Sequence, residues 1–261
     1  MLVVQIECLT ANSIERDQWS DLINGYLAAL RMNGQICGKE WPILFDSTVE
    51  TAQRCQIRAY CKTTQALANQ HNGSYVRKAL GQLAQFGIST TWQILGPDLD
   101  GLPVCACTQP SAYVLFTTYL SLEPPVRCLD CWGAVPLYTL PLLPSGEYYE
   151  LVTWQSDYQS CDALQMNCSI LERTVTRELS RPDSALSKQG RALCQTMTTL
   201  TGKPFYYYLY RASGRSHASE MKRHCPGCGD PFTPYQQPHQ VLDLQCNRCQ
   251  LFTNIGWNVR R

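Results

Sequence analysis

The sequence predicts an α+β fold, in which a body of mixed helices and strands is followed by a C-terminal zinc ribbon with four cysteines. Helical and strand-like hydrophobic patterns alternate through the first 211 residues, which is typical of a mixed body. Two Cys-x-x-Cys pairs stand 17 residues apart near the C-terminus, a spacing typical of zinc ribbons. A polar and charged segment, ASGRSHASEMKRH, precedes the first pair. We therefore divide the chain into a body over residues 1–211, a linker over 212–224 and a ribbon over 225–261.

The first 120 residues are predicted to combine short strands with two amphipathic helices. Trp19, Ile23, Tyr26 and Leu30 recur at steps of three and four residues, which places them on one face of a helix. The predicted elements are a strand over 3–9, a helix over 14–30, strands over 43–45 and 56–60, a helix over 75–86 that Gly87 closes, and a strand over 91–95.

The rest of the body is predicted to be mainly helical. Its expected elements are a strand over 113–120, one long helix over about 147–171, a helix over 187–200 and a strand over 204–210. The segments YVRKALGQLAQFGISTTWQIL and GRALCQTMTTLTGKPFYYYLY share an order of helix, glycine and aromatic strand. Two alternatives stay open: the body has two similar α/β halves, about 1–120 and 121–211, or this common pattern simply occurs twice.

The ribbon is predicted to hold one structural zinc ion. Its expected ligands are Cys225, Cys228, Cys246 and Cys249. Two residues between paired cysteines allow a tight turn that aims both sulfur atoms at one ion, and four thiolates fill its tetrahedral shell. Because no coordination position stays open for a water molecule, this site favours a structural role over hydrolysis.

A third pair of cysteines has several interpretations. Cys128 and Cys131 form another Cys-x-x-Cys pair, and Cys105 and Cys107 lie 20 residues upstream. Together they could hold a second metal ion, or the later pair could act in thiol redox chemistry. Because Cys-x-Cys is a poorer metal-binding turn than Cys-x-x-Cys, the pattern favours a third interpretation, in which these thiols pack in a core beside Trp132.

Charge and aromatic residues suggest two kinds of macromolecular partner. Residues 125–165 are acidic, and their candidates for contact with a basic protein are Asp130, Glu147, Glu150, Trp154, Asp157 and Asp162. A packed helix with a solvated polar face would explain the same residues. Residues 200–261 hold eight Lys/Arg against three Asp/Glu, and their candidates for contact with nucleic acid are Lys222, Arg223, Arg248, Arg260 and Arg261. Because the whole chain carries a net charge of only +1, a protein partner is favoured.

The remaining patterns narrow the class of protein. No phosphate-binding glycine loop or Gly-x-Ser-x-Gly motif is present, so we expect neither an enzyme nor a small-molecule substrate. No stretch approaches 18 apolar residues, so no membrane partner is expected. The 15 cysteines and the lack of a secretory signal favour the reducing cytoplasm.

Five ordered segments carry a family resemblance. They are RCLDCWGAVPLYTLP, TWQSDYQSCDALQMNC, ALSKQGRALC, GKPFYYYLYR and the CPGC…CNRC ribbon, which together cover about residues 125–255. The sequence resembles an uncharacterised bacterial family described as zinc-ribbon-containing and as a candidate for nucleic-acid binding. By analogy with small bacterial immunity proteins, we expect a protein that binds a cognate toxin domain and covers its active site. The alternative that the resemblance implies is a zinc-ribbon protein associated with nucleic acid or the ribosome.

Overall fold

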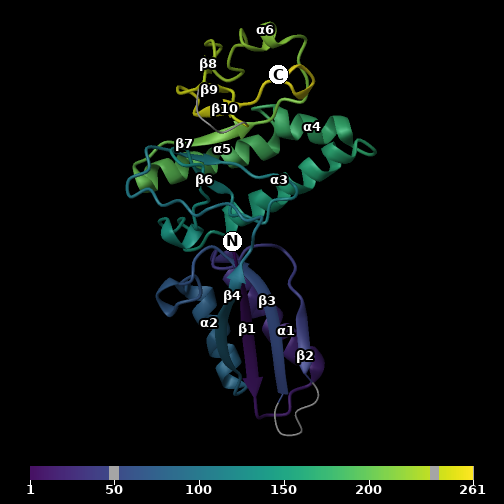
Figure 1. The fold of residues 1–261 in the computed structure, drawn as a ribbon, viewed down its shortest axis with the longest axis vertical. Coiled ribbons are helices and arrows are strands. Elements are labelled where there is room, and N and C mark those ends of the chain that lie inside the picture. The colour runs from purple at the N-terminus through teal and green to yellow at the C-terminus, as the bar shows by residue number, and fades with distance from the viewer. Residues whose placement is uncertain (47–52, 236–240, 261) are drawn as a thin grey trace. The chain divides into compact units, whose positions relative to one another are not determined.

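The computed structural model describes residues 1–46, 53–235 and 241–260, and it confirms the predicted mixture of helices and strands (Figure 1). Contacts along the chain define two compact units. The first comprises residues 1–104, 122–124 and 134–152, and the second comprises 105–121, 125–133 and 153–261. No helix in these described ranges is both long and apolar enough to cross a membrane.

The first unit has a β-α-β-β-α-β order. Its elements are β1 (Leu2–Thr10), α1 (Arg16–Met32), β2 (Ile43–Asp46), β3 (Gln53–Cys61), α2 (Ser74–Gln85) and β4 (Ser89–Pro97), with short 3-10 helices at Asn69–His71 and Leu137–Thr139. The strands form an antiparallel sheet in the order β2-β3-β1-β4. This order and topology are those of the ferredoxin-like arrangement.

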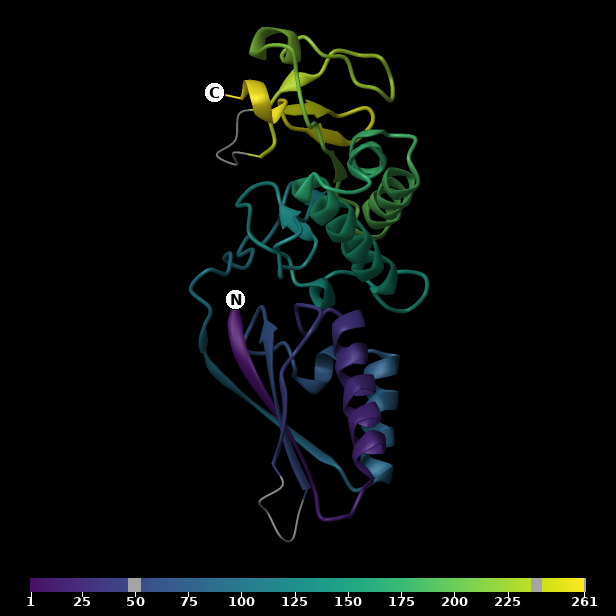
Figure 2. The same ribbon diagram turned by 90° about the vertical axis from the view of Figure 1, so that its right-hand side faces the viewer.

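Both helices cover one face of this sheet (Figure 2). Every second residue of β1 points to them, so Val4, Ile6 and Cys8 are almost fully buried. The helices contribute the predicted stripe of Trp19, Ile23, Tyr26, Leu27 and Leu30 from α1, and Val76, Ala79 and Leu83 from α2. The buried residues of the alternating pattern in β1 and of the helical pattern in α1 and α2 therefore pack together in one hydrophobic core.

A buried ion pair fixes residues 122–124 to the first unit. The Lys62 ammonium lies 2.6 Å from the Glu123 carboxylate and donates to the carbonyl oxygen of Leu102 at 2.8 Å. The N–H of Leu102 in turn donates to Glu123 at 2.9 Å. The Lys62 and Glu123 side chains are only 1% and 7% exposed, so each charge depends on the other for compensation.

The second unit is built on a six-stranded mixed sheet. Its strands, in sheet order, are β6 (Val126–Cys128), β5 (Tyr113–Leu115), β7 (Phe205–Leu209), β10 (Leu251–Thr253), β9 (Leu244–Cys246) and β8 (Thr233–Pro234). Strands β7 and β10 pair in parallel, with Leu251 opposite Tyr207. The strands of the expected ribbon therefore continue the sheet that begins with β6, β5 and β7.

Helices α3 (Tyr149–Asn167), α4 (Glu172–Ser180) and α5 (Ala185–Thr201) complete this unit. The Trp154 ring of α3 packs edge-on against Tyr207 of β7, with ring centroids 5.9 Å apart. Gly190 of α5 lies against both rings, and a Cβ atom there would stand 2.3 Å from Tyr207. A residue without a side chain thus allows α5 to approach β7 closely.

Three predicted segments differ in the structure. The strand expected over 113–120 is limited to Tyr113–Leu115, and residues 119–120 form a turn. The long helix expected over 147–171 ends at Asn167, because Cys168 and Leu171 take left-handed backbone angles (φ 51° and 54°) that interrupt a helix. A separate helix, α4, follows. Residues 212–224, expected as a linker, contain the short helix α6 (His217–Glu220), and a final 3-10 helix spans Trp257–Val259.

Candidate metal centres

The four ribbon cysteines lie together as predicted. The sulfur atoms of Cys225, Cys228, Cys246 and Cys249 are all within 4.8 Å of one another, and those of Cys228 and Cys246 are 3.6 Å apart. A zinc–sulfur distance of about 2.3 Å gives a tetrahedron with sulfur atoms about 3.8 Å apart. The cluster is therefore of the right size for a tetrahedral metal ion.

The backbone around the first pair is shaped for this cluster. The N–H of Gly229 donates to the carbonyl oxygen of Cys225 at 2.9 Å, with Gly229 in the left-handed region (φ 78°). The N–H of Gly227 points to the sulfur atom of Cys225 at 3.4 Å. A Cβ atom on Gly227 would stand 2.9 Å from the sulfur atom of Cys249, so a side chain at this position would crowd the cluster.

Two of the ribbon thiols ionise less readily than an ordinary cysteine. Burial, followed by the neighbouring thiols, raises the pKa of Cys246 to about 11 and that of Cys249 to about 12. Burial also acts to raise the pKa of Cys225, but hydrogen bonds from backbone N–H groups and the other thiols outweigh it and hold that pKa below its usual value. Four thiolates at this spacing therefore require a cation, which is the property expected of a metal site.

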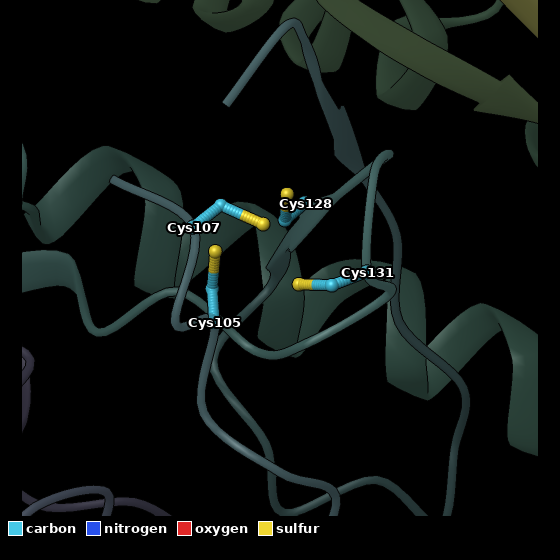
Figure 3. Close-up of side chains that lie close together, drawn as sticks. All are labelled: Cys105, Cys107, Cys128 and Cys131. Carbon is cyan, nitrogen blue, oxygen red and sulfur yellow. The ribbon is translucent and has the colours of Figure 1, made fainter. Parts of the chain in front are cut away.

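A second cluster of four cysteines lies elsewhere in the second unit (Figure 3). The sulfur atoms of Cys105, Cys107, Cys128 and Cys131 are also all within 4.8 Å of one another. Only Cys128 is buried, whereas Cys105 and Cys107 are half-buried and Cys131 is exposed. The favoured interpretation of core packing thus fits Cys128 alone. Both groups of four cysteines could hold a metal ion. The sequence favoured a single metal site, whereas the structure forms two candidate sites.

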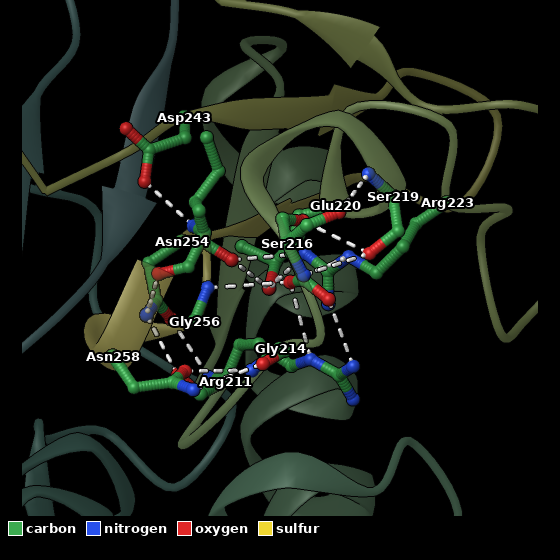
Figure 4. A network of polar contacts seen from close by, with 12 residues as sticks. Arg211, Gly214, Ser216, Ser219, Glu220, Arg223, Asp243, Asn254, Gly256 and Asn258 are labelled. Atoms are coloured by element: carbon green, nitrogen blue, oxygen red, sulfur yellow. Dashed lines mark hydrogen bonds and ion pairs between the residues drawn. The ribbon is translucent and has the colours of Figure 1, made fainter. Parts of the chain in front are cut away.

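A polar network joins residues 211–224 to the segment that follows β10 (Figure 4). The buried carboxylate of Glu220 accepts hydrogen bonds from the Arg211 guanidinium at 2.9 and 3.2 Å and lies 3.3 Å from Nε of Arg223. The fully buried Asn254 accepts from the N–H of Arg211 at 2.7 Å and donates to its carbonyl oxygen at 2.8 Å. The segment expected as a linker is therefore anchored by charge-assisted hydrogen bonds.

Three of the predicted partner-contact residues are buried. Trp154 is 0% exposed and packs against aromatic rings, so it serves the core. Asp162 accepts the N–H of Tyr119 at 2.8 Å, and burial raises its pKa. Burial also raises the pKa of Glu147, whose carboxylate accepts the N–H of Tyr75 in the first turn of α2. These side chains stabilise their own units rather than face a partner.

The other three partner candidates are accessible. Asp157 is exposed on α3, and Glu150 is half-buried and accepts a hydrogen bond from the Ser145 hydroxyl at 2.9 Å. Asp130 is exposed and accepts hydrogen bonds from the side chain and the N–H of Ser111, which hold its pKa below the usual value. The sequence could not show which of the six candidates are exposed. On α3, for example, the polar residue Asp157 is exposed whereas Asp162 is covered by other parts of its unit.

The predicted nucleic-acid residues mostly have acidic neighbours. Arg223 pairs with Glu220, Arg260 lies 3.0 Å from Asp243, and Arg248 lies 3.3 Å from Asp230. Lys222 is exposed, whereas Arg261 lies outside the described residues. Three of the five candidate residues thus lie beside a carboxylate that partly offsets their positive charge.

The structure also exposes a surface that the sequence did not indicate. Met166 lies in the last turn of α3, and Ile170 and Leu171 lie between α3 and α4; these side chains are 53%, 61% and 63% exposed. All three fall inside the helix expected over 147–171, in which no glycine or proline after Gly146 marks an earlier end. The observed break after Asn167 places Ile170 and Leu171 at a turn beside the end of α3, where Met166 lies.

Comparisons with known proteins place the chain among bacterial relatives. Three family models match in succession, each described as a domain of unknown function: DUF8589 over residues 1–96, DUF2310 over 107–210 and DUF8594 over 214–259. Residues 1–96, which lie outside the family resemblance noted in the sequence, therefore match a family model of their own.

Two relatives from Haemophilus influenzae share much of this sequence, and each is described as an "Uncharacterized protein". One is 34% identical over 251 residues, covering 96% of this chain and 96% of the relative. The other is 36% identical over 167 residues, covering 64% of this chain and 82% of the relative. A solved structure described as a putative antibiotic biosynthesis monooxygenase from Deinococcus radiodurans covers 38% of this chain and 97% of its own at 14% identity and a TM-score of 0.26, which carries no functional weight.

Proposed function

This chain belongs to the same family as the two Haemophilus influenzae proteins, and we propose that it is a non-catalytic binding protein whose partner is another protein. The observation that carries the proposal is the apolar turn formed by Met166, Ile170 and Leu171. Three large apolar side chains that are each more than half exposed would gain free energy by burial against a partner.

The geometry of the apolar turn supports a binding role. Cys168 and Leu171 both adopt left-handed backbone angles, which cost free energy in residues other than glycine and persist mainly where function requires them. Exposed charged side chains adjoin the turn, with Glu172 and Arg173 at the start of α4. An apolar centre with a polar rim is the usual composition of a protein interface.

In this proposal the ribbon cluster of Cys225, Cys228, Cys246 and Cys249 holds a structural zinc ion. Zinc is the common ion of tetrahedral four-thiolate sites, and its filled shell cannot activate water. Zinc at this place stabilises the strands that continue the sheet of the second unit. Keeping so many thiols reduced favours the cytoplasm as the site of action.

The acidic neighbours of three candidate arginines favour a protein partner over nucleic acid. A nucleic-acid surface requires basic side chains that are free to neutralise phosphates. Arg223, Arg248 and Arg260 instead lie beside Glu220, Asp230 and Asp243. In its narrower form, the proposal is that the partner is a bacterial toxin domain whose active site this protein covers, as an immunity protein does.

A pull-down from the native cells tests the proposal. The tagged protein is eluted in steps of rising salt, and both protein and nucleic acid are identified. We expect one protein to survive high salt, and we expect Ile170→Asp to lose it. Leu99→Asp is the matched control, because Leu99 is 92% exposed in the first unit. Co-expression with the captured protein then tests neutralisation.

Two other outcomes of the pull-down would contradict the proposal. Nucleic acid that elutes at moderate salt, with retention that Lys222→Ala weakens and Ile170→Asp leaves unchanged, would overturn the protein-partner proposal. If wild type and Ile170→Asp capture the same protein in equal amounts, the apolar turn is not the surface that binds the partner.

A further inference from the structure

We propose that Cys105, Cys107, Cys128 and Cys131 bind a second zinc ion, in a site separate from the ribbon cluster. The four side chains come from two segments of the chain, and their sulfur atoms lie close together (Figure 3). Their sulfur atoms lie within the same 4.8 Å limit as those of the ribbon. The size of this cluster would allow a metal ion. The backbone conformation around it is more specific evidence for a metal site.

The turn at Cys128 repeats the hydrogen bonds of the ribbon turn at Cys225. In the ribbon, the N–H of Cys225 donates to the carbonyl oxygen of Asp230 at 2.7 Å, five residues later, and the carbonyl oxygen of Cys225 accepts the N–H four residues later at 2.9 Å. In the second cluster, the N–H of Cys128 donates to the carbonyl oxygen of Gly133 at 3.0 Å, and its carbonyl oxygen accepts the N–H of Trp132 at 2.9 Å. The two turns thus share both backbone bonds at the same spacing.

Each Cys-x-x-Cys pair is followed by a residue with a left-handed backbone. These residues are Gly229 (φ 78°), Gln250 (φ 50°) and Trp132 (φ 60°). A bulky tryptophan in this conformation is an outlier that costs free energy. The conformation aims the N–H of Gly133 at the sulfur atom of Cys131, 3.3 Å away, and such a hydrogen bond stabilises a thiolate. Strain at this position is explained if a metal ion holds the turn.

The segment that carries Cys105 and Cys107, here called the Cys-x-Cys arm, is held by backbone pairing of its own. Val104 forms a parallel bridge with Ala134, and the N–H of Ala134 donates to the carbonyl oxygen of Pro103 at 2.9 Å. The chain is thereby anchored immediately before Cys105. An arm held in this way can present two thiols without the turn that a Cys-x-x-Cys pair supplies.

The alternatives explain fewer of these features. Packing in a core would bury the thiols, but Cys131 is exposed and Cys105 and Cys107 are half-buried. A redox pair at Cys128 and Cys131 would require neither of the upstream cysteines. Four thiolate ligands in a tetrahedral arrangement select zinc or iron, and zinc is the usual ion of structural sites with paired cysteines.

Metal analysis of the full chain, purified under reducing conditions, tests the proposal. We expect two zinc ions per chain by mass spectrometry of the metal. Cys131→Ser and Cys228→Ser should each retain one ion, and the double variant should retain none. Cys161→Ser is the control, because Cys161 lies outside both clusters, and it should retain two.

Cobalt substitution gives a second readout that does not depend on the folding of a variant. Thiolate-bound cobalt absorbs in the near ultraviolet and the visible range, and wild type should show twice the absorbance per chain expected for one four-thiolate site. One zinc ion per wild-type chain, lost only in Cys228→Ser, would overturn the proposal. Bound iron, or a disulfide between Cys128 and Cys131 in the purified protein, would also overturn it.

Discussion

Replacing Gly190 by alanine tests the packing of α5 against β7. In most helices this change is stabilising, because alanine has a higher helix propensity than glycine by about 1 kcal/mol. At Gly190 the new Cβ atom would stand 2.3 Å from Tyr207, 2.6 Å from Nε1 of Trp154 and 2.8 Å from a second atom of Tyr207. Ordinary van der Waals contacts begin near 3.4 Å, so the two rings would have to move by about 1 Å.

Neither ring has room to move. Trp154 and Tyr207 are both 0% exposed, and their edge-on contact links α3 to the central strand of the sheet. Overpacking of this kind costs about 3 kcal/mol at the upper end of the usual range, while the gain in helix propensity offsets about 1 kcal/mol. We therefore expect Gly190→Ala to destabilise the second unit by about 2 kcal/mol and to lower its Tm by roughly 4–8 °C.

Gly81→Ala is the matched control. Gly81 lies inside α2, and a Cβ atom there would meet nothing within 4 Å. The same substitution should stabilise the first unit by about 0.5–1 kcal/mol. Calorimetric unfolding of wild type and both variants measures the two effects. A Gly190→Ala protein as stable as wild type, or more stable, would refute the close approach of α5 to Tyr207.

Further predictions concern the buried charges and the metal. Glu220→Gln should lower the free energy of unfolding by about 2 kcal/mol, less than for a fully enclosed pair because Arg211 is partly exposed. Although burial acts in the other direction, hydrogen bonds and charges of Arg211 and Arg223 hold the pKa of Glu220 below its usual value of 4.5. Its stabilisation should therefore be complete above about pH 4.5 and disappear as the pH falls through the lowered pKa, so a pH series of denaturation curves for wild type and Glu220→Gln should converge in acid. Lys62→Met should destabilise the first unit by about 3–5 kcal/mol, because it removes the cation that faces the buried Glu123; a urea midpoint unchanged from wild type would contradict this. Removal of the proposed zinc ions by a strong chelator should abolish the near-ultraviolet circular dichroism of the whole second unit, since β10 pairs with β7; loss confined to the last 40 or so residues would show that the ribbon folds separately.

Local sequence patterns were sufficient for several elements. Alternation in β1 and the helical stripe of α1 predicted both elements to within about two residues, because each pattern reports directly which face is buried. The break between α3 and α4 was not predictable in this way, because residues 168–171 contain no glycine or proline to mark the end of a helix. The interruption depends on the backbone angles at Cys168 and Leu171, for which neither residue type has a preference.

The same distinction separates the two cysteine clusters. The ribbon cluster follows from sequence, because two Cys-x-x-Cys turns are complete local units whose spacing brings the thiols to one ion. The second cluster joins a Cys-x-Cys arm to one such turn, and its four sulfur atoms meet only because β5, β6 and the bridge between Val104 and Ala134 align distant segments. Burial of Trp154, Glu147 and Asp162 was also decided by tertiary packing, since a polar or aromatic residue on a helix does not specify which neighbours will cover it.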